Sequence, residues 1–417
     1  ILRKKAKDLT TRAEKRLRKQ IPGRTAPELR RMKVENNSRF PLELYIHIPF
    51  CVKKCAYCDF LSASADRETR EAYVSALLKE IGGLAGEYDL ADREVVSVFI
   101  GGGTPSLLEG ARMREIMDCL KERFDFASDA EITVEANPGT LDREKLRLYG
   151  GAGINRLSLG LQSASDRELR VLGRIHTYED FLESYRNARE EGFANINVDL
   201  ISAVPGQTYE DWIRNLRTVA ELGPEHISAY SLIIEPGTPF AQMELDLPDE
   251  DTEYRMYEDT AAVLREYGYR QYEISNYARE GFACRHNTGY WKRTEYLGIG
   301  LGAASLFEGR RFHNTVDMKE YLADSGRSGA IRKDMEILTR QDEEEEYMFL
   351  GLRMTEGVSG TRFAEQFREK MTDVYGEILD KYEKMGLLQK QGDFWSFTRK
   401  GIHVSNGVLA DFLQDRG

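Results

Sequence analysis

The sequence predicts an α/β fold, in which an open, incomplete (β/α)6 barrel is followed by a small, mostly helical C-terminal domain of the winged-helix type. Three observations lead to this prediction. Short apolar runs alternate with helical patterns six times within residues 41–268, and such alternation is typical of a parallel sheet covered by helices. Polar or glycine-rich residues follow most of these runs. Beyond residue 341, helices flank a polar segment that can form a two-stranded wing.

Each of the six barrel units begins with an apolar run of strand length and continues into a helical pattern. The expected strands cover residues 42–50, 95–100, 131–137, 156–163, 196–201 and 226–234. The expected helices cover residues 66–84 and 109–124, and others begin at Asp142, Ser165, Tyr178, Tyr209 and Asp249. Six units of this size suit a barrel that does not close.

The pattern divides the chain into four parts. They are a basic N-terminal extension (1–40), the partial barrel (41–268), a connecting segment rich in Gly, Tyr and Arg (269–330) and a helical domain (331–417). In the last part, helices are expected at 341–353, at 360–368, at 371–386 and from Arg399, with two strands around 387–398. Because this domain offers no basic face for DNA, we interpret it as a lid or a docking module.

The composition describes a soluble globular protein with 41% hydrophobic residues, 31% charged residues and a formal net charge of −11. No apolar run approaches the roughly 20 residues that cross a bilayer, and the N-terminus lacks the apolar core of a secretory signal. Five cysteines favour the reducing cytoplasm over a disulfide framework, and Cys119, in a helical pattern among apolar residues, is expected to be buried. The acidic body is not expected to bind nucleic acid.

The N-terminal extension has the opposite charge. Residues 1–33 hold 13 Lys and Arg against 3 Asp and Glu. Leu2, Ala6, Leu9, Ala13 and Leu17 recur at helical spacing, so the extension can form a helix with a narrow apolar stripe. This helix would pack on the body of the protein, or it would lie on RNA or on an anionic membrane surface, which would make the protein peripheral to the membrane.

Three of the five cysteines lie within the stretch PFCVKKCAYCDF, as Cys51, Cys55 and Cys58. Thiolates with the spacing C-x3-C-x2-C on one loop can bind three irons of a [4Fe–4S] cluster, which leaves the fourth iron open to a small ligand. The alternative is a structural zinc site, which requires four ligands. His47 or Cys284 would have to supply the fourth.

Polar or glycine-rich residues follow the expected strands, where a β/α barrel places its functional site. They are Cys51, the GGGTP segment (101–105), Glu135, Gln162, Asp199 and the EPGTP segment (235–239). Glycines and prolines after strands are also ordinary turn residues, so no single position by itself indicates a functional site. Their coincidence over five or six units predicts one site at the carboxyl edge of the sheet.

The cysteine spacing after a strand, together with GGGTP, resembles the signature of radical S-adenosylmethionine (SAM) enzymes. The segments YIHIPFC, GGGTPSLL, EANPGT, INRLSLGLQS, VDLISAVPGQT and YEISNYA resemble the oxygen-independent coproporphyrinogen III oxidase group of that superfamily, from about residue 42 to the end. Within the group, the chain resembles the heme chaperone branch. Phe60 stands where the oxidases carry a fourth cysteine, and an H-N-x-x-Y-W motif is present as His286, Asn287, Tyr290 and Trp291.

The resemblance implies a radical SAM barrel that holds a [4Fe–4S] cluster on Cys51, Cys55 and Cys58. It implies SAM contacts for Tyr45, Gly102, Gly103, Thr104, Glu135, Gln162, Arg174 and Asp199. Glycines let backbone groups approach the methionyl amino group closely, and Arg174 can meet a carboxylate with a forked pair of donors. Tyr57, within the cysteine loop, would pack on a ligand's ring or cover the cluster.

The resemblance also implies heme binding near the H-N-x-x-Y-W motif. A neutral His286 is a suitable ligand for heme iron, and Tyr290 and Trp291 could line a porphyrin face. Further candidates are Cys284 as a second iron ligand, and Arg285, Arg293, Arg310 and Arg311 as partners of the propionates. The alternative is a surface loop in which His286 bonds to the backbone and Trp291 is buried.

Two functions follow from the resemblance. In the first, the protein binds heme, a [4Fe–4S] cluster and SAM, and delivers heme to apo-hemoproteins, with an electron donor for the cluster. In the second, an oxygen-independent coproporphyrinogen III oxidase decarboxylates two propionates through a deoxyadenosyl radical; a variant of this enzyme would open or alkylate heme itself. The missing fourth cysteine and the heme motif favour the chaperone. Whether SAM is also turned over stays open.

Overall fold

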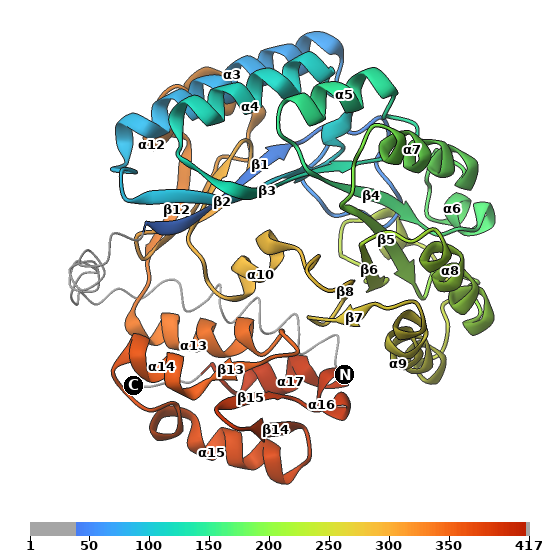
Figure 1. The fold of residues 1–417 in the computed structure, drawn as a ribbon, viewed down its shortest axis with the longest axis vertical. Coiled ribbons are helices and arrows are strands. Elements are labelled where there is room, and N and C mark those ends of the chain that lie inside the picture. Colours follow the sequence, from blue (N-terminus) through green and yellow to red (C-terminus); the bar gives the residue numbers. More distant parts are fainter. Residues whose placement is uncertain (1–38, 414–417) are drawn as a thin grey trace.

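The computed structural model describes residues 39–413, and a curved twelve-stranded sheet forms its largest part. In Figure 1, the helices between residues 67 and 266 cover the convex face of the sheet, while its concave face looks toward helix α10 (Arg285–Trp291) and a separate C-terminal unit. The strand order is β12-β11-β10-β9-β1-β2-β3-β4-β5-β6-β8-β7. The predicted α/β class with an open barrel is therefore confirmed.

Six parallel strands in the middle of the sheet follow one another in sequence order. They are β1 (Phe40–Ile48), β2 (Arg93–Gly102), β3 (Phe126–Ala136), β4 (Arg156–Gln162), β5 (Ile196–Ser202) and β6 (His226–Ser231). The helices between and after them are α3 (Arg67–Glu87), α4 (Gly110–Arg123), α5 (Arg143–Gly151), α6 (Asp166–Val171), α7 (Tyr178–Glu190), α8 (Tyr209–Glu221) and α9 (Glu250–Glu266), with short 3-10 turns η2 (Pro105–Leu107) and η3 (Pro239–Gln242). The predicted strands and helices of the six units are all present.

Polar residues fix where several of these helices begin. Thr177 and Thr208 each form a capping box with the aspartate three positions later. Asp66, Asp142 and Asp249 accept hydrogen bonds from backbone N–H groups of the first helical turn. Such side chains satisfy N–H groups that have no partner inside the helix, so each strand–helix turn ends at a defined residue.

The segment after α9 contributes strands to both edges of the sheet. The strands β7 (Arg270–Gln271) and β8 (Asn276–Ala278) extend it antiparallel from β6. The chain then forms α10 and returns to the opposite edge, where β9 (Tyr296–Ile299) pairs in parallel with β1. That edge continues with β10 (Ala304–Phe307), β11 (Arg310–Asn314), α11 (Met318–Asp324), α12 (Ser328–Ile331) and β12 (Arg332–Ile337). These strands are too short to show an alternating pattern, so the sequence did not predict them.

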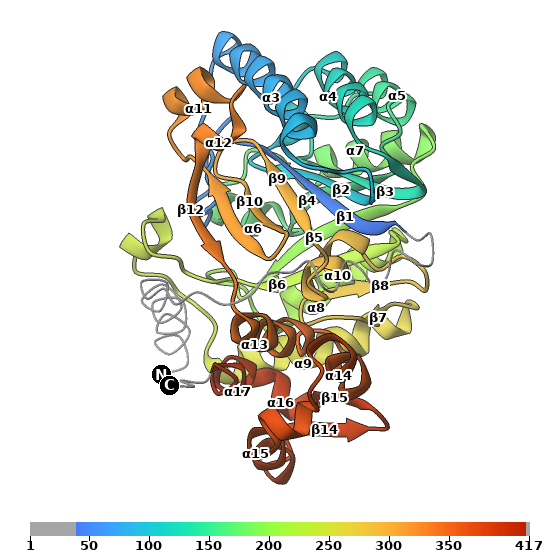
Figure 2. The same cartoon turned by 90° about the vertical axis from the view of Figure 1, so that its left-hand side faces the viewer.

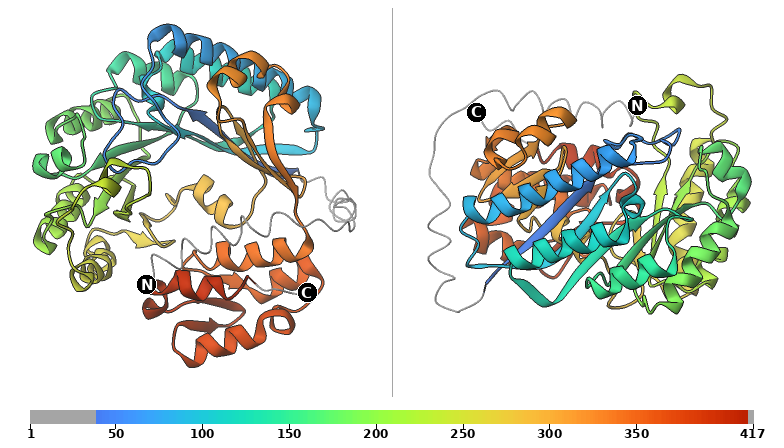
Figure 3. Two further views of the ribbon diagram at one scale, coloured as in Figure 1. Left: turned by 180° about the vertical axis from the view of Figure 1, so that it is seen from behind. Right: turned by 90° about the horizontal axis from the view of Figure 1, so that it is seen from above.

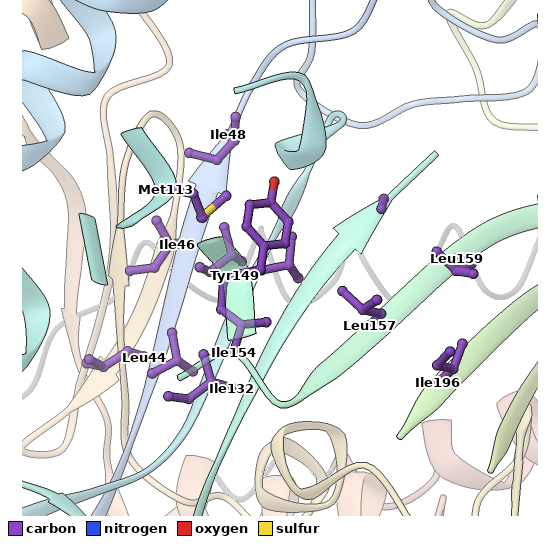
Figure 4. Close-up of a cluster of buried hydrophobic side chains, with 14 of the residues drawn as sticks. Leu44, Ile46, Ile48, Met113, Ile132, Tyr149, Ile154, Leu157, Leu159 and Ile196 are labelled. Carbon is purple, nitrogen blue, oxygen red and sulfur yellow. The ribbon is translucent and has the colours of Figure 1, made fainter. Parts of the chain in front are cut away.

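Apolar and polar side chains alternate along the central strands. Leu44, Ile46 and Ile48 of β1 are buried among apolar residues of the neighbouring strands and of the helices α4 and α5 (Figure 4). The positions between them, such as Glu43 and Tyr45, face the concave side. Parallel strands buried on both faces are normally near-continuous apolar runs. The polar residues therefore mark the concave side as a place for polar contacts.

The C-terminal unit has a core of its own, which includes Phe363, Tyr375 and Trp395. Its elements are α13 (Arg340–Gly351), β13 (Val358–Ser359), α14 (Gly360–Phe367), α15 (Met371–Lys384), β14 (Leu388–Gln391), β15 (Phe394–Phe397), α16 (Arg399–His403) and α17 (Ser405–Ala410). The strands form a small sheet in the order β13-β15-β14. The predicted helices and two-stranded wing are present, and β13 adds a third strand.

The C-terminal unit lies beside the barrel (Figures 2 and 3), and charged pairs fasten it there at two places. Glu258 of α9 pairs with Arg399 and His403 of α16. Glu346 of α13 is buried between Arg293 and Arg311, with N–O distances of 2.8 and 2.6 Å. A buried carboxylate is stable only when such partners compensate its charge. The unit is therefore held against α9 and against the α10–β11 region at once.

Two predictions concern membranes. Within residues 39–413, none of the helices combines the length and the apolar character that crossing a bilayer requires. The expected basic helix that carries Leu2 to Leu17 lies outside the described residues.

Candidate functional site

The cysteine loop follows β1 and returns beside it. Cys51 N donates to Ala63 O at 3.0 Å and Ala63 N donates to Pro49 O at 2.9 Å, which closes residues 49–63 into a loop at the carboxyl edge of the sheet. Cys51, Cys55 and Cys58 are half-buried and have free thiols. The structure thus brings three soft ligands to the carboxyl edge.

A chain of hydrogen bonds joins two of these thiols. Thr104 Oγ1 donates to Cys51 Sγ at 3.6 Å, and Asn137 Nδ2 donates to Thr104 Oγ1 at 2.8 Å. Arg174 donates to Asn137 Oδ1 at 2.7 Å and to Cys55 Sγ at 3.6 Å. These hydrogen bonds fix the positions of the two sulfur atoms at the carboxyl edge. Asn137 was missed in the sequence, although its position directly after a strand was an available signal.

Gly102 and Gly103 lie where β2 meets the cysteine loop. Gly102 has a φ of 113°, and a Cβ on Gly103 would come within 2.6 Å of Phe50 O. Thr104 N donates to the same oxygen at 2.7 Å. The close approach of these two backbone segments therefore requires glycine, independently of any contact with SAM.

Two buried carboxyl groups lie in the barrel interior. Glu135 Oε2 accepts a hydrogen bond from Gly102 N at 3.0 Å, and burial, with the charge of Asp199, raises the pKa of Glu135 to about 8. Asp199 accepts hydrogen bonds from Asn197 at 2.8 Å and Ser158 at 3.2 Å, and burial raises its pKa. Burial and a like charge both disfavour ionisation, so a positive ligand group close to the two carboxyls would stabilise their charged forms.

Gln162 ends β4 in a backbone conformation that residues other than glycine rarely adopt. Its φ is 73°, and the φ of Ala203, after β5, is 58°. Such conformations cost roughly 1–3 kcal/mol each and occur most often at functional sites. A Cβ on Gly160 would come within 3.0 Å of Gln162 Nε2 and within 3.4 Å of Arg174. Gln162 and Arg174 therefore converge at the end of β4.

Tyr45 and His47 of β1 link the cysteine loop to the strands below it. His47 Nε2 donates to Leu61 O at 2.9 Å, so its Nδ1 accepts a hydrogen bond from the Tyr45 hydroxyl at 3.0 Å. Within residues 39–413, no three His, Cys, Asp or Glu side chains could enclose a single metal ion, whereas a [4Fe–4S] cluster takes each thiolate on a separate iron. Because both nitrogens of His47 are engaged, the geometry favours the cluster over a zinc site that His47 completes.

Tyr57 lies between the cysteine loop and the barrel interior. Its ring packs with an apolar group that includes Leu172 and Phe240. Its hydroxyl lies within the influence of the charges of Arg174 and Asp199, and burial raises its pKa. A neutral Tyr57 therefore connects the loop with the carboxyl group below it.

Helix α10 fills the concave side of the barrel (Figure 1), and Glu131 of β3 holds its first residues. Glu131 Oε1 accepts hydrogen bonds from Arg285 N at 2.9 Å, from His286 N at 3.4 Å and from the Cys284 thiol at 3.4 Å. Cys284 is fully buried, and burial raises the pKa of its thiol. Since metals bind the thiolate, this neutral thiol suits neither the zinc site nor the second heme ligand that the sequence left open.

His286 points toward the strands and is 8% exposed. Its Nδ1 lies 2.9 Å from Ser97 Oγ, which also bonds to Glu43 Oε1 at 3.1 Å, and its ring stacks on Phe99 with centroids 5.2 Å apart. Burial, with the charge of Arg156, lowers the pKa of His286 to about 3, and burial raises the pKa of Glu43 to about 9. Both groups are therefore neutral at pH 7. His286 Nε2 has no hydrogen-bond partner in the part of the chain that the structure describes.

This geometry corrects the alternative in which the motif is a surface loop. His286 lies in a helix and bonds to a side chain, not to the backbone. Tyr290 packs on Tyr296 of β9, with ring centroids 5.3 Å apart, and is 42% exposed. Trp291 faces the C-terminal unit instead, where the guanidinium of Arg353 lies 4.5 Å from its ring centre. The motif therefore joins the sheet to the C-terminal unit.

Three of the four arginines expected near propionates are paired with carboxylates of the protein. Arg285 pairs with Asp129 at 2.9 Å, and Arg293 and Arg311 share Glu346. These pairs fix the positions of α10 and β11. These three guanidinium groups are therefore engaged within the protein, while Arg310 is exposed on β11.

Rows of polar residues, which the sequence did not reveal, run across the concave side. Strand register aligns Glu43, Ser97 and Glu131 in one row, and Glu135, Ser158, Asn197 and His226 in another. His226 bonds to Asn197 at 2.6 Å and to the Tyr272 hydroxyl at 2.9 Å. The signal was available, because polar residues stand at every second position of strands that are otherwise apolar.

Known proteins are similar to this chain in both fold and sequence. The model of the Radical SAM superfamily matches residues 45–219, and that of the HemN C-terminal domain matches residues 338–404. The heme chaperone HemW of Bacillus subtilis (strain 168) is 37% identical over 374 residues, which cover 88% of this chain and 98% of that protein. The heme chaperone HemW of Escherichia coli (strain K12) is 37% identical over 382 residues, which cover 90% and 99%.

A solved structure agrees with these matches. Coproporphyrinogen III oxidase (HemN) from Escherichia coli, a radical SAM enzyme, superposes with a TM-score of 0.78 at 28% identity, covering 90% of this chain and 91% of that chain. The fold and the cysteine loop thus define a radical SAM protein. Since the chain aligns with nearly the whole length of the curated relatives, it belongs, within that class, to the family of the heme chaperones HemW. The resemblance seen in the sequence is confirmed.

Proposed function

We propose that this protein is a heme chaperone, which binds a [4Fe–4S] cluster, SAM and heme and delivers heme to apo-hemoproteins. The observation that carries the proposal is His286, a neutral imidazole whose Nδ1 is engaged by Ser97 while its Nε2 has no partner among the described residues. The names of the curated relatives support the same function.

The cluster would be held by Cys51, Cys55 and Cys58. Soft sulfur ligands suit iron–sulfur chemistry, and the donors of Thr104 and Arg174 support negative charge on two of the sulfurs. When bound, the cluster supplies the electron that cleaves SAM in radical SAM enzymes. Here, the protein's own contribution is to hold the thiolates at the carboxyl edge and to balance their charge.

SAM would lie beside the loop at the same edge. The proposed contacts are Tyr45, Tyr57, Gly102, Gly103, Thr104, Glu135, Gln162, Arg174 and Asp199. Glu135 and Asp199 are acceptors for amino and hydroxyl groups, and their raised pKa values favour a ligand that brings positive charge. Arg174 supplies positive charge for a carboxylate at the end of β4.

Heme would be bound at α10, with His286 as the iron ligand and Tyr290 and Trp291 against the porphyrin. Ser97 fixes the orientation of the imidazole through Nδ1, and such support of the second nitrogen is common for histidine ligands. The depressed pKa keeps the ring neutral throughout the physiological range, so protons do not compete with iron.

The partners would be heme-accepting apo-hemoproteins and an electron donor. We place the protein in the cytoplasm, because five free cysteines suit a reducing compartment. Contact of the basic N-terminal extension with a membrane surface stays a prediction, which vesicle pelleting with and without residues 1–38 would test.

Hemin titration of the full chain tests the proposal. The protein is reconstituted anaerobically with iron and sulfide, and its Soret band is followed during titration. The variant His286→Phe keeps an aromatic ring against Phe99 but removes the iron ligand, so we expect hemin affinity to fall at least about tenfold, as for the loss of one coordination bond. The cluster absorbance should not change.

The matched control is His313→Phe, at a half-buried position of β11. It should bind hemin as the parent does. Equal hemin binding by the parent and by His286→Phe would show that His286 is not the ligand. Absence of tight hemin binding by the parent, together with decarboxylation of coproporphyrinogen, would overturn the chaperone function itself.

A further inference from the structure

Within residues 39–413, the guanidinium of Arg353 forms no ion pair with a carboxylate. Arg353 follows α13, and its side chain lies over Trp291 with 4.5 Å between the guanidinium carbon and the ring centre. Among residues 39–413, no hydrogen bond or ion pair engages this side chain, and its Nε is buried without a partner. Burial lowers the pKa of Arg353, which shows that the positive charge is poorly solvated where it stands.

Neighbouring arginines are in a different situation. Arg293 and Arg311 bond to Glu346, and Arg399 bonds to Glu258. The carboxyl group of Glu273 influences the charge of Arg353. Its Oε1 accepts hydrogen bonds from Ser275 N at 2.8 Å and from the Asn276 side chain at 2.6 Å, and within residues 39–413 it forms no ion pair with Arg353. Among the described residues, the N–H donors of the Arg353 guanidinium are therefore not bonded to a carboxylate.

Other polar atoms around Arg353 are also unsatisfied. Trp291 Nε1 lies in the ring that Arg353 covers, and Asn276 Oδ1 belongs to the side chain that bonds to Glu273; both are buried without a hydrogen-bond partner. A buried donor or acceptor without a partner destabilises the protein. The cost would be recovered by a ligand that brings complementary polar atoms.

Aromatic rings give the same place an apolar wall. Tyr290 and Tyr230 are 42% and 40% exposed, and the hydroxyl groups of both act on the charge of Arg353. Together with Trp291, these two tyrosines place partly exposed aromatic rings near the guanidinium of Arg353. A flat, largely apolar molecule with a carboxylate at its edge matches this combination.

We propose that Arg353 binds a propionate carboxylate of heme, with the edge of the tetrapyrrole against Trp291 and Tyr290. The inference rests on the proposed heme chaperone function and deepens it. Trp291 follows His286 by five residues on α10, about 7.5 Å along a helix axis. The same five residues turn about 140° around the helix axis, so His286 faces the strands and Trp291 faces the C-terminal unit. A porphyrin is wider than this rise, and it would extend from the strand side of α10 toward the C-terminal unit. The C-terminal unit then supplies part of the heme site.

The opposing view is that Arg353 only packs on Trp291. Packing and carboxylate binding are separated by changing the ligand and the protein together. Hemin carries two free propionates, hemin dimethyl ester carries none, and iron-free protoporphyrin carries the propionates without the metal. All three are titrated into the full, reconstituted chain in one detergent-containing buffer.

The parent should bind hemin at least about tenfold more tightly than the dimethyl ester, since the ester cannot form the charge-assisted hydrogen bond. Arg353→Gln should lose that preference, with weaker binding of hemin and little change for the ester. Protoporphyrin should respond to Arg353→Gln but not to His286→Phe, because it offers no iron. Arg353→Lys keeps the positive charge but lacks the two parallel donors of a guanidinium. Its preference for hemin over the ester should lie between those of the parent and Arg353→Gln.

The matched control is Arg362→Gln, an exposed arginine of the same unit. It should leave all three affinities unchanged. If Arg353→Gln weakens hemin and ester equally, Arg353 has a packing role and the inference is overturned while the chaperone function stands. The same holds if Arg353→Gln keeps the full preference for hemin. If the parent binds none of the three ligands, both the proposed chaperone function and the inference about Arg353 are overturned.

Discussion

The carboxyl edge of the barrel and helix α10 occupy the same concave face, but they are built in different ways. At the edge, residues from five strands meet because parallel strands end together, from Cys51 after β1 to Asp199 in β5. Helix α10 instead enters after the last barrel helix and touches β1, β2 and β3 through side chains. The first region follows from strand order, whereas the second depends on individual contacts.

The two regions also differ in charge. The carboxyl edge combines three thiols and two carboxyl groups with the guanidinium of Arg174. The net charge of this edge therefore changes when charged ligands bind. Around His286, burial keeps the imidazole and the Glu43 carboxyl neutral. The edge is therefore suited to charged ligand groups, while α10 offers a neutral nitrogen. Three experiments test whether the two regions are as independent as this difference indicates.

The largest effect is expected from replacing Cys51, Cys55 and Cys58 by serine together. Bound iron and the cluster absorbance should disappear, because three of the thiolate ligands are gone. Hemin affinity should stay within about twofold, since distant sites usually act independently. Cys119→Ser, a half-buried position of α4, is the control and should keep the cluster. Loss of hemin binding in the triple variant would mean that the two regions form one site.

The second experiment concerns the contact between α10 and β1. Gly289→Ala would place a methyl group on the carboxyl of Glu43, so we expect a loss of about 1–3 kcal/mol in the free energy of unfolding, as for other overpacked interiors. Urea denaturation measures it. Gly150→Ala, at a helical position with open space around it, should change stability by less than about 1 kcal/mol. A double variant with Glu43→Ala should lose less than the two single variants predict together; strict additivity would contradict the contact.

The third experiment measures a change in pH dependence. Since the pKa of Glu43 is raised to about 9 in the folded protein, from an ordinary value of 4.5, the native state holds its proton over that range. The contribution of protonated Glu43 to the free energy of unfolding is complete below pH 4.5 and is lost as the pH rises through 9. Glu43→Gln cannot ionise, so its stability should fall less steeply between pH 6 and 9, by at most about 1.4 kcal/mol per pH unit. Parallel curves for the parent and the variant in urea titrations would rule out a protonated Glu43.

Much of the barrel was predictable because each strand carries its own pattern. The order β1 to β6, the parallel pairing and the place of Cys51, Gly102 and Gln162 follow from alternation alone. The strands β7 to β12 did not follow, since their pairing depends on distant partners and their runs are short. In the site, Asn137 and Ser97 were missed, because a polar residue on the concave side is recognisable only when the strand register is known.

The arginines show the same limit more sharply. The resemblance made Arg285, Arg293 and Arg311 candidate partners of the propionates, but each has a carboxylate partner that comes from another element. Arg353 attracted no notice in the sequence, and its lack of a partner is visible only in three dimensions. Residue type predicts what a side chain can bind, and the fold decides whether it is free to do so.

The pairing of β1 with β9 has a consequence for synthesis of the chain. The first strand of the barrel is flanked by β2 early, whereas among residues 39–413 its other edge pairs with Tyr296–Ile299. At roughly 5–20 residues per second, a ribosome reaches that segment on the order of ten seconds or more after β1. During that interval β1 is an open edge, which is a template for pairing with other chains. A nascent chain arrested before Arg285 would expose this edge and would be prone to aggregate.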